Sequence, residues 1–140
     1  MRVLSLILAA GCATLAPVAA AGMLILPSGE SARPLPVIWD EDTSAIRLRF
    51  VVERLSEPAS LYAGDPLRVF EDMQWLCETQ VPVLFDETED PRADGWEGAV
   101  VTLMDREVVF GTVDTNAVQL FEWFIFGIDG CEIDLDAYDE

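Results

Sequence analysis

The chain has 140 residues, enough for one domain and too short for two ordinary ones. It carries 26 acidic residues against eight basic ones, a net charge of −18 at pH 7, and it contains neither lysine nor histidine. Such a charge repels nucleic acid and anionic membranes, so we expect neither as a partner. The acidic surface is either simply solvated or complementary to a cationic protein partner.

The first 21 residues have the order of a signal peptide. Arg2 precedes an uncharged, mostly apolar stretch over residues 3–15, Pro17 ends it, and Val18-Ala19-Ala20-Ala21 offers the small residues that a signal peptidase accepts. We expect cleavage after Ala21, or alternatively after Ala20. Residues 22–140 would then form one small acidic domain that is periplasmic or secreted.

Cys12 suggests an alternative route. Leu8-Ala9-Ala10-Gly11-Cys12 is similar to a bacterial lipobox, in which the cysteine is lipidated. Only about ten residues precede Cys12, which is short for the apolar region, and the alanine site follows downstream. In this alternative the protein is a lipoprotein anchored to a membrane through Cys12.

Three segments in the first half are predicted as strands. Residues 23–26 form a short apolar run that ends at Pro27, and residues 37–39 form another after two prolines. The clearest strand covers residues 46–53, in which apolar side chains alternate with Arg47, Arg49, Val51 and Glu53. This period of two places one face in the core and leaves the other at least half solvated.

A helix is predicted from Leu67 to about Thr79. Asp65 suits the N-cap and Pro66 the first helical position. One face of this helix is apolar, with Val69, Phe70, Met73, Leu76 and Cys77. Trp75 points the other way, beside Glu71, Asp72 and Glu78. It is either a partner contact, together with Glu71 and Glu78, or is covered by the proline-rich N-terminal segment.

A polar loop over residues 86–97 follows a strand predicted over 81–85. Oxygen-bearing side chains stand at the spacing of an EF-hand calcium loop: Asp86, Thr88, Asp90, Asp94 and Glu97. Pro91 replaces the glycine that the sharp turn requires, and strands rather than helices are expected on both sides. The loop is therefore either a calcium site or a solvated acidic segment, and we expect no other cofactor.

The last third is predicted to be a hairpin followed by a helix. Residues 99–104 and 107–110 would pair around Asp105-Arg106. Asp114 would cap a second helix over residues 115–126, ended by Gly127 and Gly130. The fold class expected from this order is α+β, a largely antiparallel sheet of five or six strands with two helices packed on it.

The sequence resembles a family of small exported bacterial proteins of unknown function. The resemblance rests on Leu26-Pro27-Ser28-Gly29, Arg49-Phe50-Val51, Asp72-Met73, Leu76-Cys77-Glu78, Asp105-Arg106, Val108, Phe110-Gly111, Gln119, Phe121-Glu122 and Asp129-Gly130-Cys131. It implies export and a paired Cys77 and Cys131, and it supplies no catalytic residues. Some members bear the name acetolactate synthase, but the Gly-Asp-Gly motif of that thiamine diphosphate enzyme is absent here.

The cysteine count agrees with one disulfide. Cleavage at Ala21 leaves only Cys77 and Cys131, and two cysteines in an exported protein are most simply paired with each other. Such a bond leaves no thiol for chemistry.

The missing side-chain types favour a non-enzymatic protein. Without histidine or lysine, the chain can build no Ser-His-Asp or Cys-His system and no Schiff base. We therefore expect an exported domain that acts by binding, as an accessory or partner-recognition module. Two alternatives are an acidic inhibitor of a cationic secreted enzyme such as a lysozyme, and a hydrolase that works through two carboxylates.

Overall fold

The structure, a computed structural model, describes residues 22–138. The predicted signal peptide, including Cys12, lies outside these residues. The strands are β1 (Leu24–Ile25), β2 (Ser31–Pro34), β3 (Ile38–Asp40), β4 (Ala45–Val51), β5 (Gly98–Met104), β6 (Gln119–Gly127) and β7 (Gly130–Ile133). The helices are α1 (Pro66–Gln80) and three short 3₁₀ helices, η1 (Pro82–Leu84), η2 (Pro91–Asp94) and η3 (Leu135–Tyr138).

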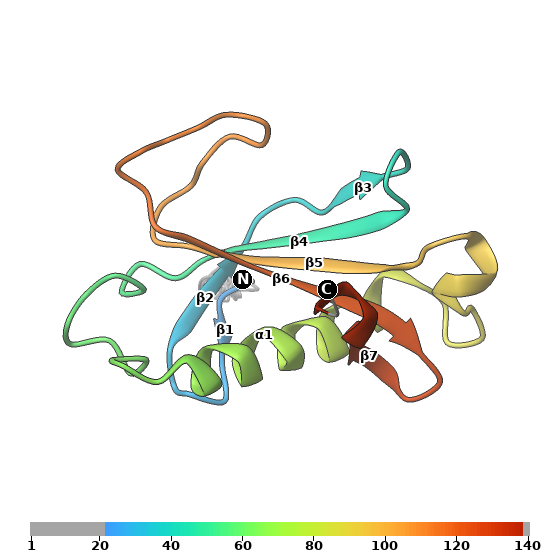
Figure 1. Cartoon of the computed structure of the whole chain (residues 1–140), viewed down its shortest axis with the longest axis horizontal. Helices are drawn as coiled ribbons and strands as arrows, with labels where there is room; N and C mark the ends of the chain where they lie inside the picture. Colours follow the sequence, from blue (N-terminus) through green and yellow to red (C-terminus); the bar gives the residue numbers. More distant parts are fainter. Residues whose placement is uncertain (1–21, 139–140) are drawn as a thin grey trace, which may run out of the picture.

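The expected fold class is wrong, because the described chain is mostly β and has a single α-helix. Its strands form a curled mixed sheet in the order β1-β2-β4-β5-β6-β7, and β3 also pairs with β4. Helix α1 lies along one face of the sheet (Figure 1) and contacts β5, β6 and β7. All strand pairs are antiparallel except β4 and β5, which are parallel and are connected through α1.

Strand β4 confirms the alternating pattern in the sequence. Ile46, Leu48 and Phe50 are buried in the main core, whereas Arg47 and Arg49 are half-buried on the opposite face. Strands β2 and β3 lie one after the other along the same edge of β4. Pro36 separates them, and a proline has no N–H group for a sheet hydrogen bond.

The predicted first helix is confirmed as α1. The side chain of Asp65 accepts a hydrogen bond from the backbone N–H of Arg68, and Pro66 occupies the first turn. Met73, Leu76 and Cys77 are buried beneath the helix, with Val69 and Phe70 partly buried beside them. The segment after α1 is the 3₁₀ helix η1 rather than the predicted strand over 81–85, because Pro82 sits at its first position.

The predicted hairpin and second helix are both wrong. Strand β5 is confirmed, but it pairs with β6, which runs through the segment expected to be helical. Between them, residues 105–118 form a long loop instead of a tight turn and a strand. Strand β6 carries apolar residues on both of its faces, and such a run satisfies a helical periodicity as well as a strand. Its aromatic residues favour the strand.

Gly98 allows β5 and β6 to approach closely at one end. A Cβ atom at this position would overlap the backbone carbonyl oxygen of Phe124 and the ring of Trp123. The backbone at that end of the pair therefore depends on the absence of a side chain.

A buried polar cluster joins the N-terminal turn to α1. The carboxyl group of Asp72, which is fully buried, accepts hydrogen bonds from the backbone N–H of Ser28 (2.9 Å), the hydroxyl of Ser28 and the hydroxyl of Tyr62 (2.5 Å). Glu30 is also buried and accepts from the N–H of Leu61 at 2.6 Å. Asp72, expected on the polar side of the helix, is thus a long-range anchor.

In the part of the chain that the structure describes, no helix has the length and apolar character needed to cross a membrane.

Candidate functional site

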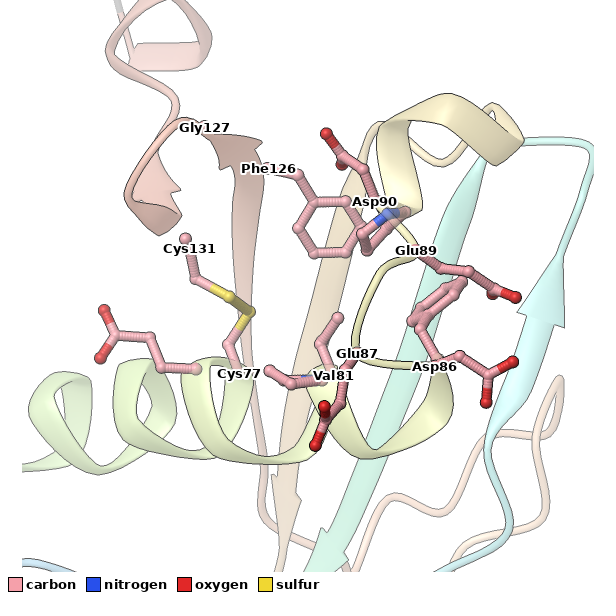
Figure 2. Close-up of a pocket in the computed structure, with 14 residues that line it drawn as sticks. Cys77, Val81, Asp86, Glu87, Glu89, Asp90, Phe126, Gly127 and Cys131 are labelled. Carbon is pink, nitrogen blue, oxygen red and sulfur yellow. A yellow bond between two sulfur atoms is a disulfide. The ribbon is translucent and has the colours of Figure 1, made fainter.

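A pocket of about 200 Å³ lies where the C-terminal half of α1, the acidic loop and the β6–β7 hairpin meet. Figure 2 shows this site, with the Cys77–Cys131 disulfide on one side and the loop carboxylates on the other. The lining residues are Cys77, Glu78, Val81, Pro82, Phe85, Asp86, Glu87, Glu89, Asp90, Pro91, Phe126, Gly127, Gly130 and Cys131.

The disulfide fixes two walls of the pocket relative to each other. The sulfur atoms of Cys77 and Cys131 lie at bonding distance, 1.99 Å, and the two residues are 54 positions apart in the chain. One belongs to α1 and the other to β7. Both cysteines are buried, so the bond acts as a strut and is not an exposed reactive group.

The floor of the pocket is apolar. Val81 is buried, and Phe85 and Phe126 are partly buried against the main core. These side chains come from the end of α1, from the segment after η1 and from β6. They offer an occupant a surface on which methylene groups or a ring can be desolvated.

The rim of the pocket is acidic. Glu78, Asp86, Glu87 and Glu89 are exposed, and none of the four forms an ion pair with a described residue. No lining residue is basic. An apolar floor within a ring of unpaired carboxylates favours an occupant that combines positive charge with an apolar part.

Asp90, the fifth acid of the rim, is held by Arg92. The Arg92 guanidinium binds its carboxylate at 2.8 Å, and the Arg92 backbone N–H donates to it at 3.0 Å. These hydrogen bonds, first from the side chain and then from the backbone, hold the pKa of Asp90 below its usual range. The group therefore stays ionised at neutral pH, which is the opposite of what a general acid requires.

The pocket unites residues that the sequence had assigned to separate features. Glu78 comes from the predicted partner contact, Asp86 and Asp90 from the predicted calcium loop, and the cysteines from the predicted disulfide. Trp75 is half-buried and packs against the main core, and Glu71 is exposed, but neither lines the pocket.

The predicted calcium ligands do not converge. Thr88 and Glu97 do not line the pocket, and Asp94 belongs to a different hollow beside Glu41. Among residues 22–138, no three acidic, cysteine or histidine side chains are grouped to hold a metal ion. We therefore propose no calcium site in this loop.

The sequence did not assign several lining residues to any site, among them Val81, Phe85, Glu87, Glu89 and Phe126. Phe85 and Phe126 had been assigned to a strand and a helix that do not form. The available signal was the apolar segment over 81–85 followed directly by a run of acids. The opposite wall of the pocket could not be predicted from the sequence, because it is formed by the hairpin between β6 and β7.

A family model described as a family of unknown function (DUF6497) matches residues 8–135. The resemblance to an uncharacterised family is thereby confirmed. Comparisons with curated proteins and with solved structures gave no match.

Proposed function

The chain belongs to this family of unknown function, and we propose that it acts by binding a cationic partner in the acidic pocket. The observation that carries the proposal is the combination of an apolar floor and four unpaired rim carboxylates, Glu78, Asp86, Glu87 and Glu89. An arginine or lysine side chain suits this shape, because its stem is apolar and its tip is charged. The partner would be a basic protein that presents such a side chain beside apolar residues.

We further propose that binding takes place outside the cytoplasm. The support is the order of residues 1–21, which matches a signal peptide, together with a disulfide that an oxidising compartment would form. A cationic secreted enzyme is one partner of this kind, in which case the protein would act as its inhibitor. Asp90 is held ionised by Arg92 and so cannot serve as the protonated general acid of a carboxylate pair, which favours binding over hydrolysis.

Calorimetric titration with three probes tests the proposal. The probes are a short peptide of alternating arginine and leucine, the same peptide with glutamine in place of arginine, and spermine, which is cationic without an apolar body. We expect only the basic peptide to bind strongly. Its dissociation constant should rise about tenfold between about 20 and 200 mM salt, because exposed charge pairs are screened.

A matched pair of variants locates the binding. Replacement of Glu78, Glu87 and Glu89 with glutamine removes three rim charges, and we expect binding to weaken about tenfold, since each exposed pair contributes roughly 0.2–1 kcal/mol. The control replaces Glu41 and Glu53 with glutamine and Asp42 with asparagine. These three are exposed and lie outside the pocket. Equal weakening in both variants would show that only net charge matters and would refute the pocket.

A further inference from the structure

The sheet face opposite α1 carries a second hollow, of about 300 Å³. This volume lies at the lower end of the range for small-molecule sites, about 300–1,000 Å³. Arg49 on β4 pairs with Thr102 on β5, which pairs with Phe121 on β6, so the three side chains stand in one row across the sheet. We call this hollow the Arg49 groove. Its other lining residues are Arg47, Val108, Val109, Phe110, Gly111, Thr112, Val113, Asp114 and Gln119.

The loop over residues 105–118, which arches away from the sheet in Figure 1, forms the outer wall of the groove. Its two ends are joined by hydrogen bonds from the N–H of Asp105 to the carbonyl of Val118 (3.0 Å) and from the N–H of Val118 to the carboxylate of Asp105 (3.0 Å). Near the start of the loop, the Arg49 guanidinium donates to the carbonyl of Val108. The groove is thus preformed at its base.

Arg49 is a half-buried cation without an acidic partner. Five of the seven described arginines have a carboxylate within ion-pair distance, and within residues 22–138 only Arg49 and Arg68 have none. Arg68 lies exposed near the start of α1, whereas Arg49 lines the groove. The guanidinium of Arg49 stands 5.8 Å from the centre of the Phe110 ring and uses one donor on Val108. Its other donors lack a protein acceptor among the described residues.

Two further polar groups of the groove lack a partner. Thr102 is only 4% exposed, yet its hydroxyl makes no hydrogen bond to any residue that the structure describes. Gln119 is half-buried, and its side-chain amide likewise has no partner within residues 22–138. No fully buried side-chain nitrogen or oxygen among residues 22–138 lacks a hydrogen-bond partner, so the Thr102 hydroxyl and the Gln119 amide keep contact with solvent in the groove. A ligand oxygen that enters the groove would take the place of water at these donors.

The remaining wall is apolar and exposed. Val113 is 89% exposed, Phe121 61% and Phe110 51%. The acid of the lining is Asp114, whose carboxylate accepts the N–H of Asn116 at 2.9 Å, and the second cation, Arg47, is paired with Asp40 at 2.9 Å. One guanidinium without a carboxylate partner, one hydroxyl and an apolar wall define the chemistry of the groove.

We propose that the Arg49 groove binds a small organic monocarboxylate with an apolar body. The carboxylate meets the planar donor fork of Arg49 and the hydroxyl of Thr102, which are neighbours in the sheet register. The apolar body covers Phe121 and Val113. A single negative charge is specified because Asp114 and the net charge of −18 disfavour a multiply charged anion.

Titration with 4-phenylbutyrate and with 4-phenylbutanol, its uncharged counterpart, tests this site by calorimetry and by backbone NMR shifts. We expect saturable binding of the carboxylate, at least tenfold weaker binding of the alcohol, and shifts at residues 49, 102, 108–114 and 119–121. Arg49→Gln should weaken carboxylate binding at least tenfold. Thr102→Val, which keeps the shape of the side chain, should weaken it severalfold.

Arg68→Gln is the matched control, because it removes the other arginine without a carboxylate partner and leaves the groove intact. It should bind the carboxylate as the wild type does. If Arg49→Gln disturbs the 105–118 loop, Thr102→Val and the comparison of 4-phenylbutyrate with 4-phenylbutanol still test whether the groove recognises a carboxylate. Equal binding of acid and alcohol, equal weakening by Arg68→Gln, or no saturation up to about 10 mM would each overturn the proposal.

Discussion

At the scale of single residues, the polar cluster around Asp72 shows what sequence alone does not reveal. The helical pattern placed Asp72 on a polar face beside Glu71. The structure buries it completely, because Ser28 and Tyr62, which are 44 and 10 positions away, donate to its carboxyl group. An acid can be buried when donors that are distant in the sequence form hydrogen bonds to it. The local hydrophobic periodicity of a helix does not predict such donors.

Ser28→Ala tests the contribution of this cluster to stability. The variant removes the hydroxyl donor to Asp72, whose Oδ2 then keeps only the hydrogen bond from Tyr62, and it removes the acceptor of the Glu30 N–H. We expect a loss of about 1–3 kcal/mol in the free energy of unfolding, measured by urea denaturation. Ser31→Ala, at an exposed strand position, is the control and should change stability by less than about 0.5 kcal/mol. Equal effects would argue against the cluster.

Tyr62 makes the stability that this cluster contributes depend on pH. Burial first, and then the hydrogen bond to Asp72, raise the pKa of Tyr62 far above its ordinary value of 10.0. The folded state therefore holds this proton more tightly than the unfolded state does. The corresponding stability is fully present below pH 10 and is lost as the pH rises above that value.

Absorbance titration of the phenol measures this effect. Tyr138→Phe leaves Tyr62 as the single tyrosine of the chain. We expect its ionisation to be delayed well beyond pH 10 and to coincide with alkaline unfolding followed by circular dichroism. Ionisation near pH 10 while the protein remains folded would show that burial and the hydrogen bond to Asp72 do not raise the pKa of Tyr62.

At the scale of the elements, the sequence predicted those whose signals are local. The strict alternation over β4 and the Asp65-Pro66 start of α1 are such signals, and both were confirmed. The segment over 115–126 was misread because β6 is apolar on both faces. Strand β6 pairs with β5 across the long loop over residues 105–118. No local turn signal in the sequence predicts that pairing.

The disulfide links elements that are distant in the sequence. It joins α1 to β7, because the helix predicted over residues 115–126, before Cys131, does not form. Its stabilising effect still follows from the length of chain that it closes. For a separation of 54 residues, the chain-entropy model gives about 4 kcal/mol.

Cys77→Ser and Cys131→Ser should therefore lower the melting temperature by more than about 10 °C. Both single variants and the double variant should melt alike, because each loses the same bond. The measurement is differential scanning calorimetry on protein that begins after Ala21, which excludes Cys12. Two free thiols per unfolded, unreduced wild-type chain would show that the bond does not form.

At the scale of the whole molecule, composition predicted the sign of the charge but not its distribution. The unpaired carboxylates Glu78, Asp86, Glu87 and Glu89 gather at one pocket, while Arg47 and Arg49 lie together on the open face of the sheet. Their spacing along β4 showed that these arginines share a face. Only the assembled sheet shows that Thr102 and Phe121 stand beside them.

Binding of a cationic partner in the acidic pocket is tested most directly by mapping backbone amide shifts during titration with the arginine–leucine peptide. We predict that the largest shifts fall on residues 77–91 and 126–131, around the disulfide and the loop acids. Shifts spread evenly over the acidic surface, or confined to the Arg49 groove, would contradict binding in the acidic pocket.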